Sequence, residues 1–420
     1  MTAILFISFA VLLLLGVPIA FSVALAATAV LFAGDIPFTL IAQRMFASTD
    51  SFPLVAVPFF ILAGDLLARG TISKKLVEFA ESLMGEMRGA LSAVSVVAGM
   101  FFAAISGSGA ATTAAVGATL IPELKARKYE ESSAAALIAS AGCIGVVIPP
   151  SVPMVLYAVI ADQSVTQLFR NGFIPGFMMG GVLIAIALKQ AYDKNYPKGK
   201  PFSFDNVVKT FVPAIWGIMM PLIILGGIFS GVFTPSEAAA VAVIYAVLVS
   251  FLIYRDMTMK ELYQIILGSA RTSAIIMIII ACSGIFGWVL GNWKIPQAVA
   301  QMVLAVSDNK YVIIFLMSII ILIAGVFMET SSAVILLTPV FLPLVKMLGV
   351  NLVHFGILFT VGIAIGMITP PVAINLFVAS SVTGLPLERI AKSVVPYLLG
   401  LIAMFLVYVY IPLVFPGIIF

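Results

Sequence analysis

The chain has 420 residues, of which 62% are apolar and only 10% are charged. A soluble domain is usually about 45–50% apolar and about 25% charged. The 22 basic and 18 acidic side chains are therefore too few to cover a soluble protein of this size. The apolar runs are continuous and do not alternate with polar residues, which excludes an outer-membrane barrel. The sequence predicts an all-α polytopic membrane protein.

Charge and cysteine content exclude several further classes. The net charge of +4 is modest and the basic residues lie in short loops, so we expect no nucleic-acid partner. Cys143 and Cys282 lie far apart in separate apolar runs, which argues against a disulfide framework or a metal cluster. No nucleotide-binding P-loop motif is present, and nothing in the sequence indicates an enzyme.

Each half of the chain is predicted to hold the same series of helices. The series is three apolar spans, an amphipathic connector, a long small-residue segment, a span broken by Pro-Pro and a closing span. In the first half these lie near 1–15, 18–33, 53–68, 72–89, 91–124, 132–161 and 172–190. In the second half they lie near 211–232, 237–254, 263–291, 294–308, 311–345, 353–382 and 394–414.

A single offset relates the two halves. A shift of 221 residues places Gly145-Val-Val-Ile-Pro-Pro150 on Gly366-Met-Ile-Thr-Pro-Pro371. The same shift also aligns Pro122 with Pro343 and Pro175 with Pro396. Such self-similarity indicates two copies of one structural unit, which we divide as 1–209 and 210–420.

The distribution of basic residues indicates that the two copies are inverted. Basic residues gather at the connector and after the long segment of the first copy, but are scarce at the corresponding places in the second. They are Arg69, Lys74, Lys75, Arg88, Lys125, Arg127 and Lys128, against Lys294 and Lys346. Because cytoplasmic loops carry the excess of Lys and Arg, equivalent loops of the two copies are expected on opposite sides of the membrane.

Two segments are too long to be single straight spans. The segments 91–124 and 311–345 break near Ser106-Gly-Ser-Gly109 and near Met328-Glu-Thr-Ser331. Inversion requires each to enter and leave the membrane on one side, as a re-entrant helical hairpin. Non-helical backbone at this depth persists only when it is buried in protein or lines a cavity.

Inverted repeats with interrupted helices are typical of secondary transporters, and the interruptions carry the chemistry. An interrupted helix leaves free carbonyls, which suit a cation, and free N–H groups, which suit an anion. Proline and glycine in Gly145–Pro150, with the hydroxyls of Ser106 and Ser108, give an all-oxygen site that suits Na⁺. The repeat predicts a second site, where Gly366, Thr369 and Pro371 meet the 328–331 loop.

Each of these motifs has a purely structural alternative. The Ser-Gly-Ser-Gly run can be a close helix contact, and Pro-Pro can be a simple kink. Glu329 is an acid within an apolar segment and therefore marks an ion path, but it could instead pair with a cation or cap a half-helix. Asn375 could orient a substrate or pack helices. Thr234-Pro-Ser-Glu237 has the pattern of a capping box, so Glu237 is interpreted as structural.

Several motifs together resemble the large membrane subunit of tripartite ATP-independent periplasmic (TRAP) transporters, and the resemblance covers the whole chain. They are Gly16-Val-Pro-Ile-Ala-Phe21, Asp50-Ser-Phe-Pro-Leu-Val-Ala-Val-Pro-Phe-Phe-Ile-Leu-Ala-Gly64, Ile105-Ser-Gly-Ser-Gly109, Gly145-Val-Val-Ile-Pro-Pro-Ser151, Val232-Phe-Thr-Pro-Ser-Glu-Ala238 and Gly366-Met-Ile-Thr-Pro-Pro371.

The resemblance implies a Na⁺-driven importer of organic acids, such as C4-dicarboxylates or sialic acids, in a bacterial inner membrane. It implies two protein partners, a small four-helix membrane subunit on a separate chain and a periplasmic substrate-binding protein. It also implies an elevator-type fold, in which a scaffold with arm helices near 72–89 and 294–308 supports a transport domain with the two hairpins.

The resemblance also implies site residues. The first Na⁺ site would use Ser106, Ser108, Gly145, Ile148 and Pro150. The second would use Gly325, Glu329 or Thr330, Gly366, Thr369 and Pro371. Substrate contacts are expected at Thr112, Ser331 and Asn375. Many relatives carry Asp where this chain has Glu329, which keeps the charge but changes the reach of the ligand.

Two other functions remain open on the sequence. One is a self-sufficient sodium/carboxylate carrier of the same architecture that needs neither partner. The other is a structural or signalling membrane protein with a repeat that transports nothing. Na⁺-dependent stabilisation would distinguish a carrier from the second of these.

Overall fold

The computed structural model describes residues 1–68, 71–298, 301 and 309–414, and within these ranges the regular secondary structure is helical. Seven of the described helices are long and apolar enough to cross a membrane, or eight if Thr39–Thr49 and Phe52–Ala68 form one bent span. The chain is therefore a multi-pass membrane protein. Most of the predicted arm helix 294–308 lies outside the described residues, although 295–298 are helical.

In the first half the helices follow the predicted series closely. They are α1 (Thr2–Leu14), α2 (Ile19–Ala33), α3 (Thr39–Thr49), α4 (Ala56–Ala68), α5 (Thr71–Met84), α6 (Ala90–Ser106), α7 (Gly109–Ala126), α8 (Glu131–Gly142), α9 (Val152–Ala161) and α10 (Val165–Asp193). Helix α3 was not predicted. The connector α5 ends at Met84, five residues before the predicted end at 89, because Gly85 takes a positive φ of 61°.

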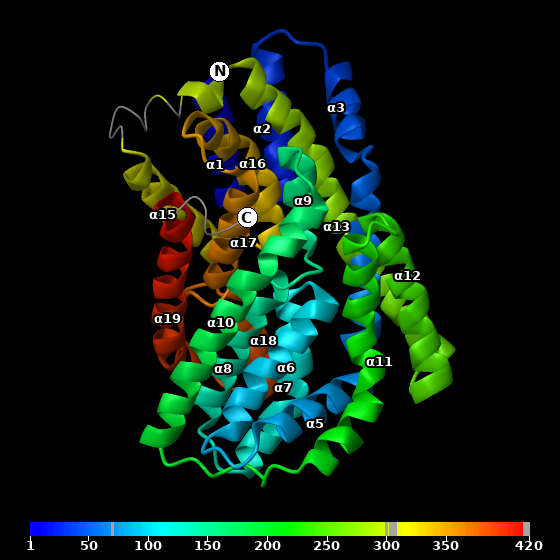
Figure 1. Cartoon of the computed structure of the whole chain (residues 1–420). Coiled ribbons are helices and arrows are strands. Elements are labelled where there is room, and N and C mark those ends of the chain that lie inside the picture. Colours follow the sequence, from blue (N-terminus) through cyan, green and yellow to red (C-terminus); the bar gives the residue numbers. More distant parts are fainter. Residues whose placement is uncertain (69–70, 299–300, 302–308, 415–420) are drawn as a thin grey trace.

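The second half contains α11 (Phe204–Phe229), α12 (Pro235–Leu248), α13 (Met259–Asn292), α15 (Lys310–Phe327), α16 (Thr330–Met347), α17 (Leu352–Gly366), α18 (Ile374–Thr383) and α19 (Leu387–Val414). Equivalent helices begin about 221 residues apart, as with Gly109 of α7 and Thr330 of α16. In Figure 1, α5, α6 and α7 lie in the lower half of the molecule and α16 lies in the upper half. This placement agrees with inverted copies, but the inversion itself stays a prediction.

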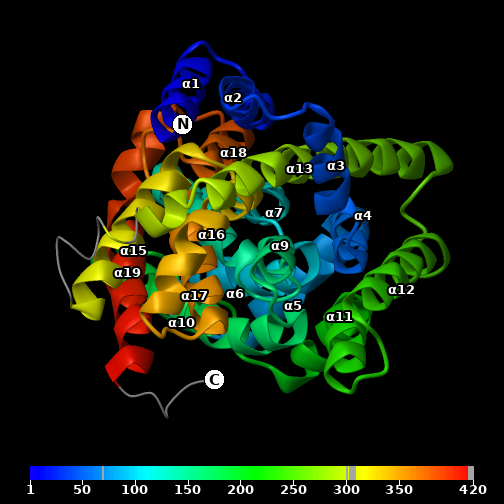
Figure 2. The same cartoon turned by 90° about the horizontal axis from the view of Figure 1, so that it is seen from above.

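The helices can be divided into two groups, although α4 and α5 of one also pack against α6 of the other. The hairpin group contains α6–α10 and α15–α19, joined by contacts such as α8 with α19, α9 with α16 and α7 with α18. The outer group contains α1–α5 and α11–α13, joined by contacts such as α4 with α12, α3 with α13 and α5 with α11. Seen from above, α3, α4, α11 and α12 lie on one side and α10, α15, α17 and α19 on the other (Figure 2). Each group draws helices from both halves of the chain.

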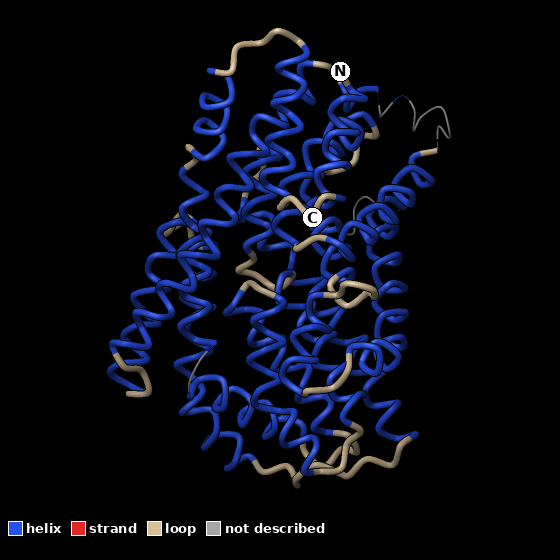
Figure 3. The backbone as a smooth tube through the Cα atoms, turned by 180° about the vertical axis from the view of Figure 1, so that it is seen from behind, coloured by secondary structure: helices blue, strands red, loops and turns tan. Residues whose placement is uncertain are grey.

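Short non-helical segments interrupt the helices within the body of the molecule. Figure 3 shows them as tan stretches at mid-height, away from the loops at both ends. They include the break between α6 and α7 at Gly107–Ser108 and that between α15 and α16 at Met328–Glu329. The half-helices α7, α9 and α16 start at side-chain caps, which satisfy N–H groups that have no helical partner, whereas α18 has no such cap. Ser108 accepts from the Ala111 N–H, and Ser151 accepts from the Met154 N–H.

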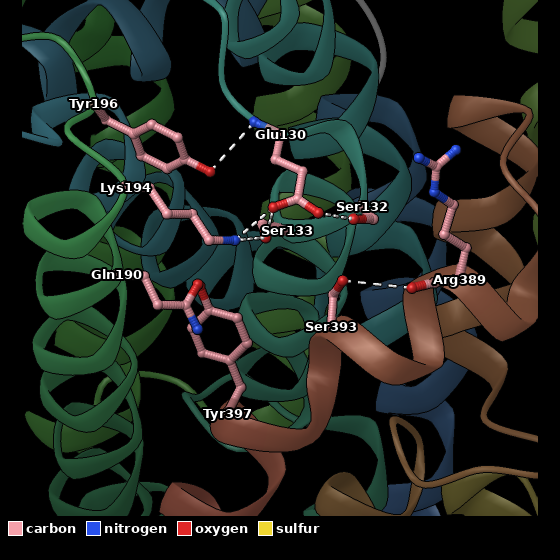
Figure 4. Close-up of polar contacts among 9 residues, drawn as sticks. All are labelled: Glu130, Ser132, Ser133, Gln190, Lys194, Tyr196, Arg389, Ser393 and Tyr397. Atoms are coloured by element: carbon pink, nitrogen blue, oxygen red, sulfur yellow. Dashed lines mark hydrogen bonds and ion pairs between the residues drawn. The ribbon is translucent and has the colours of Figure 1, made fainter.

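A polar cluster ties one end of the hairpin group together (Figure 4). The Lys194 ammonium at the end of α10 contacts the Glu130 carboxylate at the start of α8 at 2.5 Å. The Tyr397 hydroxyl of α19 donates to Gln190 Oε1 of α10 at 3.0 Å. These contacts join the closing helices of the two halves to the broken helix of the first.

The predicted capping box at the start of α12 is confirmed. Thr234 Oγ1 accepts from the Glu237 N–H, and the Glu237 carboxylate accepts from the Thr234 N–H at 2.8 Å. Both bonds serve only the helix start, so Glu237 is structural. The two cysteines are free and buried.

Candidate functional site

A cavity of about 420 Å³ lies between the two hairpin tips. Its inner wall comes from the hairpin group and its outer wall from the outer group. The inner wall contains Ser106–Ala110, Val146, Val152, Pro153, Glu329, Ser331, Ser332, Met367 and Ile374. The outer wall contains Ile61 and Asp65 of α4 with Thr272, Ile275, Ile276 and Ile279 of α13. This volume lies within the range of small-molecule sites.

Four half-helices begin at the inner wall. The first residues of α7, α9, α16 and α18 lie at or next to Gly109, Val152, Ser331 and Ile374, all of which line the cavity. Helix starts expose N–H groups and the positive end of the helix dipole, so they favour an anion. The Ser108 hydroxyl, which accepts from the Ala111 N–H, adds a further donor, whereas the Ser106 and Ser331 hydroxyls donate to the Ser108 carbonyl oxygen and to Glu329.

The outer wall contributes a carboxylate that the sequence analysis did not single out. Asp65 is half-buried on α4, and the Ser269 hydroxyl of α13 donates to Asp65 Oδ2 at 2.6 Å. The preceding Gly64 touches the first tip, because a Cβ there would lie 2.8 Å from Ser106 Cα. Asp65 is therefore held beside the hairpin tip from the opposite side of the cavity.

Four of the five residues predicted for the first Na⁺ site lie together. The Ser106 hydroxyl lies 3.2 Å from the Ser108 carbonyl oxygen, to which it donates. A Cβ at Gly145 would lie 2.6 Å from that same carbonyl oxygen, so only glycine allows this approach. A Cβ at Gly107 would lie 2.8 Å from the Pro150 carbonyl oxygen. The tip of the first hairpin therefore packs backbone to backbone against the first Pro-Pro break.

The other two residues assigned near this tip have structural contacts. Ile148 is buried, and its side chain fills the space where a Cβ at Gly176 would stand. Thr112 is buried with its Oγ1 atom 2.9 Å from Ser106 Oγ. Thr112 holds the tip serine and does not itself line the central cavity.

The second predicted Na⁺ site has a similar backbone contact. A Cβ at Gly366 would lie 2.3 Å from the Gly325 carbonyl carbon, so α15 and α17 meet through two glycines. The Thr330 hydroxyl donates to Met367 Sδ at 3.1 Å. Glu329 caps α16, accepting from the Ser331 N–H at 2.9 Å and the Ser332 N–H at 3.2 Å, and it also lines the cavity. The capping interpretation of Glu329 thus holds alongside its place in the site.

Thr369 and Pro371 of this second set are less buried than Ile148 and Pro150, which lie 221 positions earlier. The Thr369 hydroxyl donates to the Ile365 carbonyl oxygen at 3.0 Å, within its own turn. Pro371 is exposed, whereas its equivalent Pro150 is buried. The second break is therefore the more open of the two.

Of the residues predicted to contact substrate, Ser331 lines the cavity and Asn375 does not. Asn375 is fully buried, and its Nδ2 atom donates to the Ala139 carbonyl oxygen at 3.2 Å. It joins α18 to α8, which is the packing role that the sequence left open.

Two acidic side chains line the cavity. Among the described residues that line it, the ionisable ones are Asp65 and Glu329. The remaining polar surface consists of hydroxyls and backbone groups. An anion entering this space would have donors to bind but also two carboxylates nearby.

A one-sided series of cavities extends from the site. A second cavity, of about 520 Å³, shares Asp65 with the first and follows the alanines of α7 to Thr119. A third cavity shares Thr119 and reaches Lys74, Glu78 and Glu123. A cavity on the other side, next to Ser48, Ser283 and Pro339, shares no lining residue with the central one. Among the described residues, the series of cavities therefore leads from the central site toward α5.

The sequence as a whole matches one family model. The model describes the DctM component of tripartite ATP-independent periplasmic transporters and matches residues 6–414. The chain belongs to this family. It is therefore a large permease subunit, as the motifs predicted, and its relatives are permeases and not enzymes.

Curated relatives align over nearly the whole chain. The 2,3-diketo-L-gulonate TRAP transporter large permease of Escherichia coli is 37% identical, over 95% of this chain and 94% of that one. The C4-dicarboxylate TRAP transporter large permease of Pseudomonas aeruginosa is 39% identical, over 93% and 91%. An isethionate TRAP transporter permease of Oleidesulfovibrio alaskensis is 40% identical over 97% of this chain, which spans 65% of that longer protein.

Solved structures of low identity share the fold. The YdaH transporter of Alcanivorax borkumensis superposes with a TM-score of 0.65 at 14% identity, covering 90% of this chain and 88% of that one. The MtrF protein of Neisseria gonorrhoeae gives a TM-score of 0.61 at 14% identity, covering 89% and 84%.

The residues of the outer wall, Asp65 and Thr272 among them, were not predicted from the sequence. Asp65 lies near the end of a predicted apolar span, four residues before Arg69. A charged residue at such a place is usually interpreted as marking the end of the membrane-spanning segment. The signal was nevertheless available, because Asp65 immediately follows the Phe-Phe-Ile-Leu-Ala-Gly64 motif. Thr272 gave no signal, because it comes to line the cavity only when α13 packs against α4.

Proposed function

We propose that this chain is the membrane permease of a Na⁺-coupled importer that carries an organic anion across the bacterial inner membrane. A small four-helix membrane subunit would complete the membrane part, and a periplasmic binding protein would deliver the substrate. Family membership supports this assembly over a self-sufficient carrier.

The observation that carries the proposal is the combination of donors and carboxylates around one cavity. The start of α7 and the Ser108 hydroxyl favour an anion, but the Glu329 carboxylate opposes one. Binding of cations resolves this conflict, because each Na⁺ near the wall offsets one negative charge. Coupling to Na⁺ then follows, since the anion binds well only with its cations.

The proposed cation positions are the two backbone contacts at the tips. The first would use Ser106, Ser108, Gly145, Ile148 and Pro150, and the second Gly325, Glu329, Thr330, Gly366, Thr369 and Pro371. Carbonyl and hydroxyl oxygens, with one carboxylate, are the ligands that hard cations prefer. Ser106, Ser108 and Gly145 already lie in contact and Pro150 touches the intervening Gly107, which supports that site most directly.

The substrate is proposed to be a small organic acid. Relatives are named for isethionate, 2,3-diketo-L-gulonate, C4-dicarboxylates and sialic acid. A cavity of about 420 Å³ is large enough for any of them.

Transport is proposed to proceed by elevator-like alternating access. The hairpin group would move against the outer group, with α4 and α13 as the fixed wall that Ser106 and Glu329 pass. The one-sided series of cavities toward α5 supports a site open to the side that carries Lys74 and Lys75, which the positive-inside rule makes cytoplasmic.

A Na⁺ titration of thermal stability tests the coupling. We expect the melting temperature of the purified chain to rise with Na⁺ but not with K⁺ or choline at equal ionic strength, because only the bound ion stabilises the fold. Glu329→Gln should shift the titration to at least about tenfold higher Na⁺ through loss of one ligand charge.

Glu237→Gln is the matched control, because it also removes a carboxylate from a helix start but lies away from the cavity. It should titrate as the unmodified chain does. Equal stabilisation by Na⁺ and K⁺ would reject the proposal.

A further inference from the structure

We infer that a polar latch between α5 and α7 holds the chain in the arrangement in which the site is open toward α5, and that this latch is released in every transport cycle. The latch consists of two contacts, Ser73 with Thr119 and Glu81 with Arg127. Its role rests on the proposed movement of the hairpin group and adds how that movement is controlled.

The latch joins the outer group to the hairpin group at two points. The Ser73 hydroxyl of α5 lies 3.1 Å from Thr119 Oγ1 of α7. Arg127, directly after α7, donates from Nη2 to Glu81 Oε1 of α5 at 2.7 Å. The two points are equally far apart in sequence on both segments, from 73 to 81 and from 119 to 127, which is about 12 Å along a helix. Together they fix the direction of α7 on α5 as well as its distance.

The latch lies where the series of cavities reaches α5. Ser73 and Thr119 line the second cavity, and Glu81 and Thr119 line the third. The latch contacts are therefore formed in the arrangement that connects the site to this side. Movement of the hairpin group toward the other side would carry Thr119 and Arg127 away from their partners on α5.

Both charged members of the latch have a second partner in place. Arg127 Nη2 also contacts Glu123 Oε1 of α7 at 2.6 Å, and Lys200 Nζ, between α10 and α11, lies 3.4 Å from Glu81 Oε1. The Arg127 and Glu81 side chains are only 25% and 17% exposed. Separating such a pair would be costly if it left an enclosed charge without a partner. Because Glu123 and Lys200 remain, the latch can be released without that cost.

Two further ion pairs lie within the hairpin group and do not cross between the groups. Lys125 after the middle of α7 pairs with Glu131 of α8 at 2.7 Å, and Lys194 pairs with Glu130 at 2.5 Å. Movement of the hairpin group as a unit would leave these contacts intact. They serve as controls for the loss of an ion pair as such.

Bridging the latch tests whether it must be released. In the double variant Ser73→Cys with Thr119→Cys, Hg²⁺ joins the two thiolates and fixes α7 to α5. The variant is reconstituted with its small subunit in proteoliposomes, with the periplasmic binding protein outside, and uptake of radiolabelled gluconate and succinate is driven by Na⁺. We expect Hg²⁺ to reduce uptake at least about tenfold, and 2-mercaptoethanol to restore it, because a fixed hairpin group cannot complete the cycle.

Ser82→Cys with Thr210→Cys is the matched control. The Thr210 hydroxyl of α11 donates to Ser82 Oγ of α5 at 2.9 Å, and both helices belong to the outer group. Hg²⁺ should change uptake by this variant, and by each single cysteine variant, no more than it changes uptake by the unmodified chain. The unmodified chain accounts for reaction at the native cysteines.

Cysteine labelling without substrate tests the latch independently of uptake. Ser283 of α13 is buried beside the cavity on the other side, which the proposed movement would open. In a Ser283→Cys background, Glu81→Gln should speed reaction with a maleimide at least about threefold, because an ion pair of this kind favours one arrangement by roughly that factor. Glu131→Gln, which breaks the pair with Lys125 inside the hairpin group, should leave the rate unchanged.

The outcomes separate the latch from the proposed function. Uptake that is unchanged after Ser73→Cys and Thr119→Cys are bridged, or that falls equally in the Ser82→Cys and Thr210→Cys control, overturns the latch and leaves Na⁺-coupled import standing. Uptake of neither anion by the unbridged chain contradicts the proposed function. The labelling rates then decide the latch by themselves, and equal rates in Glu81→Gln and Glu131→Gln overturn it.

Discussion

Ser108 and Glu329 occupy equivalent positions at the tips of the two hairpins, and each caps the half-helix that follows. Ser108 does this with a neutral hydroxyl, and Glu329 with a carboxylate that also lines the cavity. The two tips are therefore alike in backbone but unlike in charge. We expect the second cation position to depend on Glu329 more strongly than the first depends on Ser108.

Replacing Ser108 by alanine should lower both stability and Na⁺ affinity. Loss of the cap costs about 1 kcal/mol, and the proposed first Na⁺ position loses one oxygen. Thr369→Ala should likewise lower Na⁺ affinity at the proposed second position, because that position also loses one oxygen. Na⁺ titrations of the melting temperature measure both effects.

Ser164→Ala is the matched control for Ser108→Ala. Ser164 caps α10 through the Gln167 N–H and does not line the cavity. It should lose similar stability but keep its Na⁺ titration unchanged. If Ser108→Ala also keeps its titration, Ser108 is not a ligand.

The Glu130–Lys194 pair predicts a dependence of stability on pH. Hydrogen bonds from Lys194, then from Ser132, hold the pKa of Glu130 below its usual value of 4.5. A carboxyl with a lowered pKa stabilises the fold above its usual pKa, and this contribution is lost as pH falls through the lowered pKa. Because both side chains are more than one-third exposed, the contribution is at most about 1 kcal/mol.

Glu130→Gln should therefore lose less stability than the unmodified chain between pH 7 and pH 3, as measured by melting temperatures in detergent. Lys194→Met should remove the same increment, because it breaks the pair from the other side. Equal losses in the unmodified chain and Glu130→Gln would show that the pair does not contribute.

At the level of elements, the broken helices meet the hairpins through glycines. A Cβ at Gly325 would lie 2.7 Å from the Ile363 carbonyl oxygen and 2.9 Å from Ile363 Cα, both backbone atoms that have little freedom to move. Gly325→Ala should separate α15 from α17 and cost about 1–3 kcal/mol. It should also weaken Na⁺ binding at the proposed second position.

Gly226→Ala provides the comparison, because a Cβ there would meet nothing within 4 Å. Within a helix such a change is neutral or stabilising by up to about 1 kcal/mol. Thermal unfolding of the two variants in Na⁺ and in K⁺ measures both effects. If Gly325→Ala matches Gly226→Ala in stability and in Na⁺ response, the close contact is not needed.

The sequence predicted the elements best where glycine, serine and proline interrupt an apolar run. The break at 106–109 corresponds to the end of α6 and the start of α7, and the break at 328–331 to the end of α15 and the start of α16. Glycine, serine and proline interrupt helices through their own backbone and capping preferences, which a sequence shows directly. Helix α3 was missed, since Thr39–Thr49 is short and only mildly apolar. Its place depends on packing against α13, which no local pattern records.

The candidate site was predicted only on its inner wall. Ser106, Ser108, Glu329 and Ser331 belong to motifs that repeat at one offset, so the sequence could bring them together. Asp65 and Thr272 come from different helices of the outer group with no repeat to relate them. Their meeting across the cavity depends on tertiary packing alone.

At the scale of the whole molecule, the outer group and the hairpin group share the central cavity between them. The Asp65 wall belongs to one group and the four helix starts belong to the other. Movement of one group past the other would therefore change the composition of the site as well as its access. In the proposed elevator mechanism this would provide a physical reason for release, because an anion and its Na⁺ ions would lose part of their binding wall as the groups slide.

The central claim is that Na⁺ drives the uptake of an organic anion through this chain. The direct measurement is uptake of radiolabelled gluconate and succinate into proteoliposomes that contain the chain and its small subunit, with the periplasmic binding protein supplied outside. An inward Na⁺ gradient should drive accumulation of at least one of these anions, and replacing Na⁺ by K⁺ should abolish it. Accumulation that is unchanged after Na⁺ is replaced by K⁺ would contradict the account.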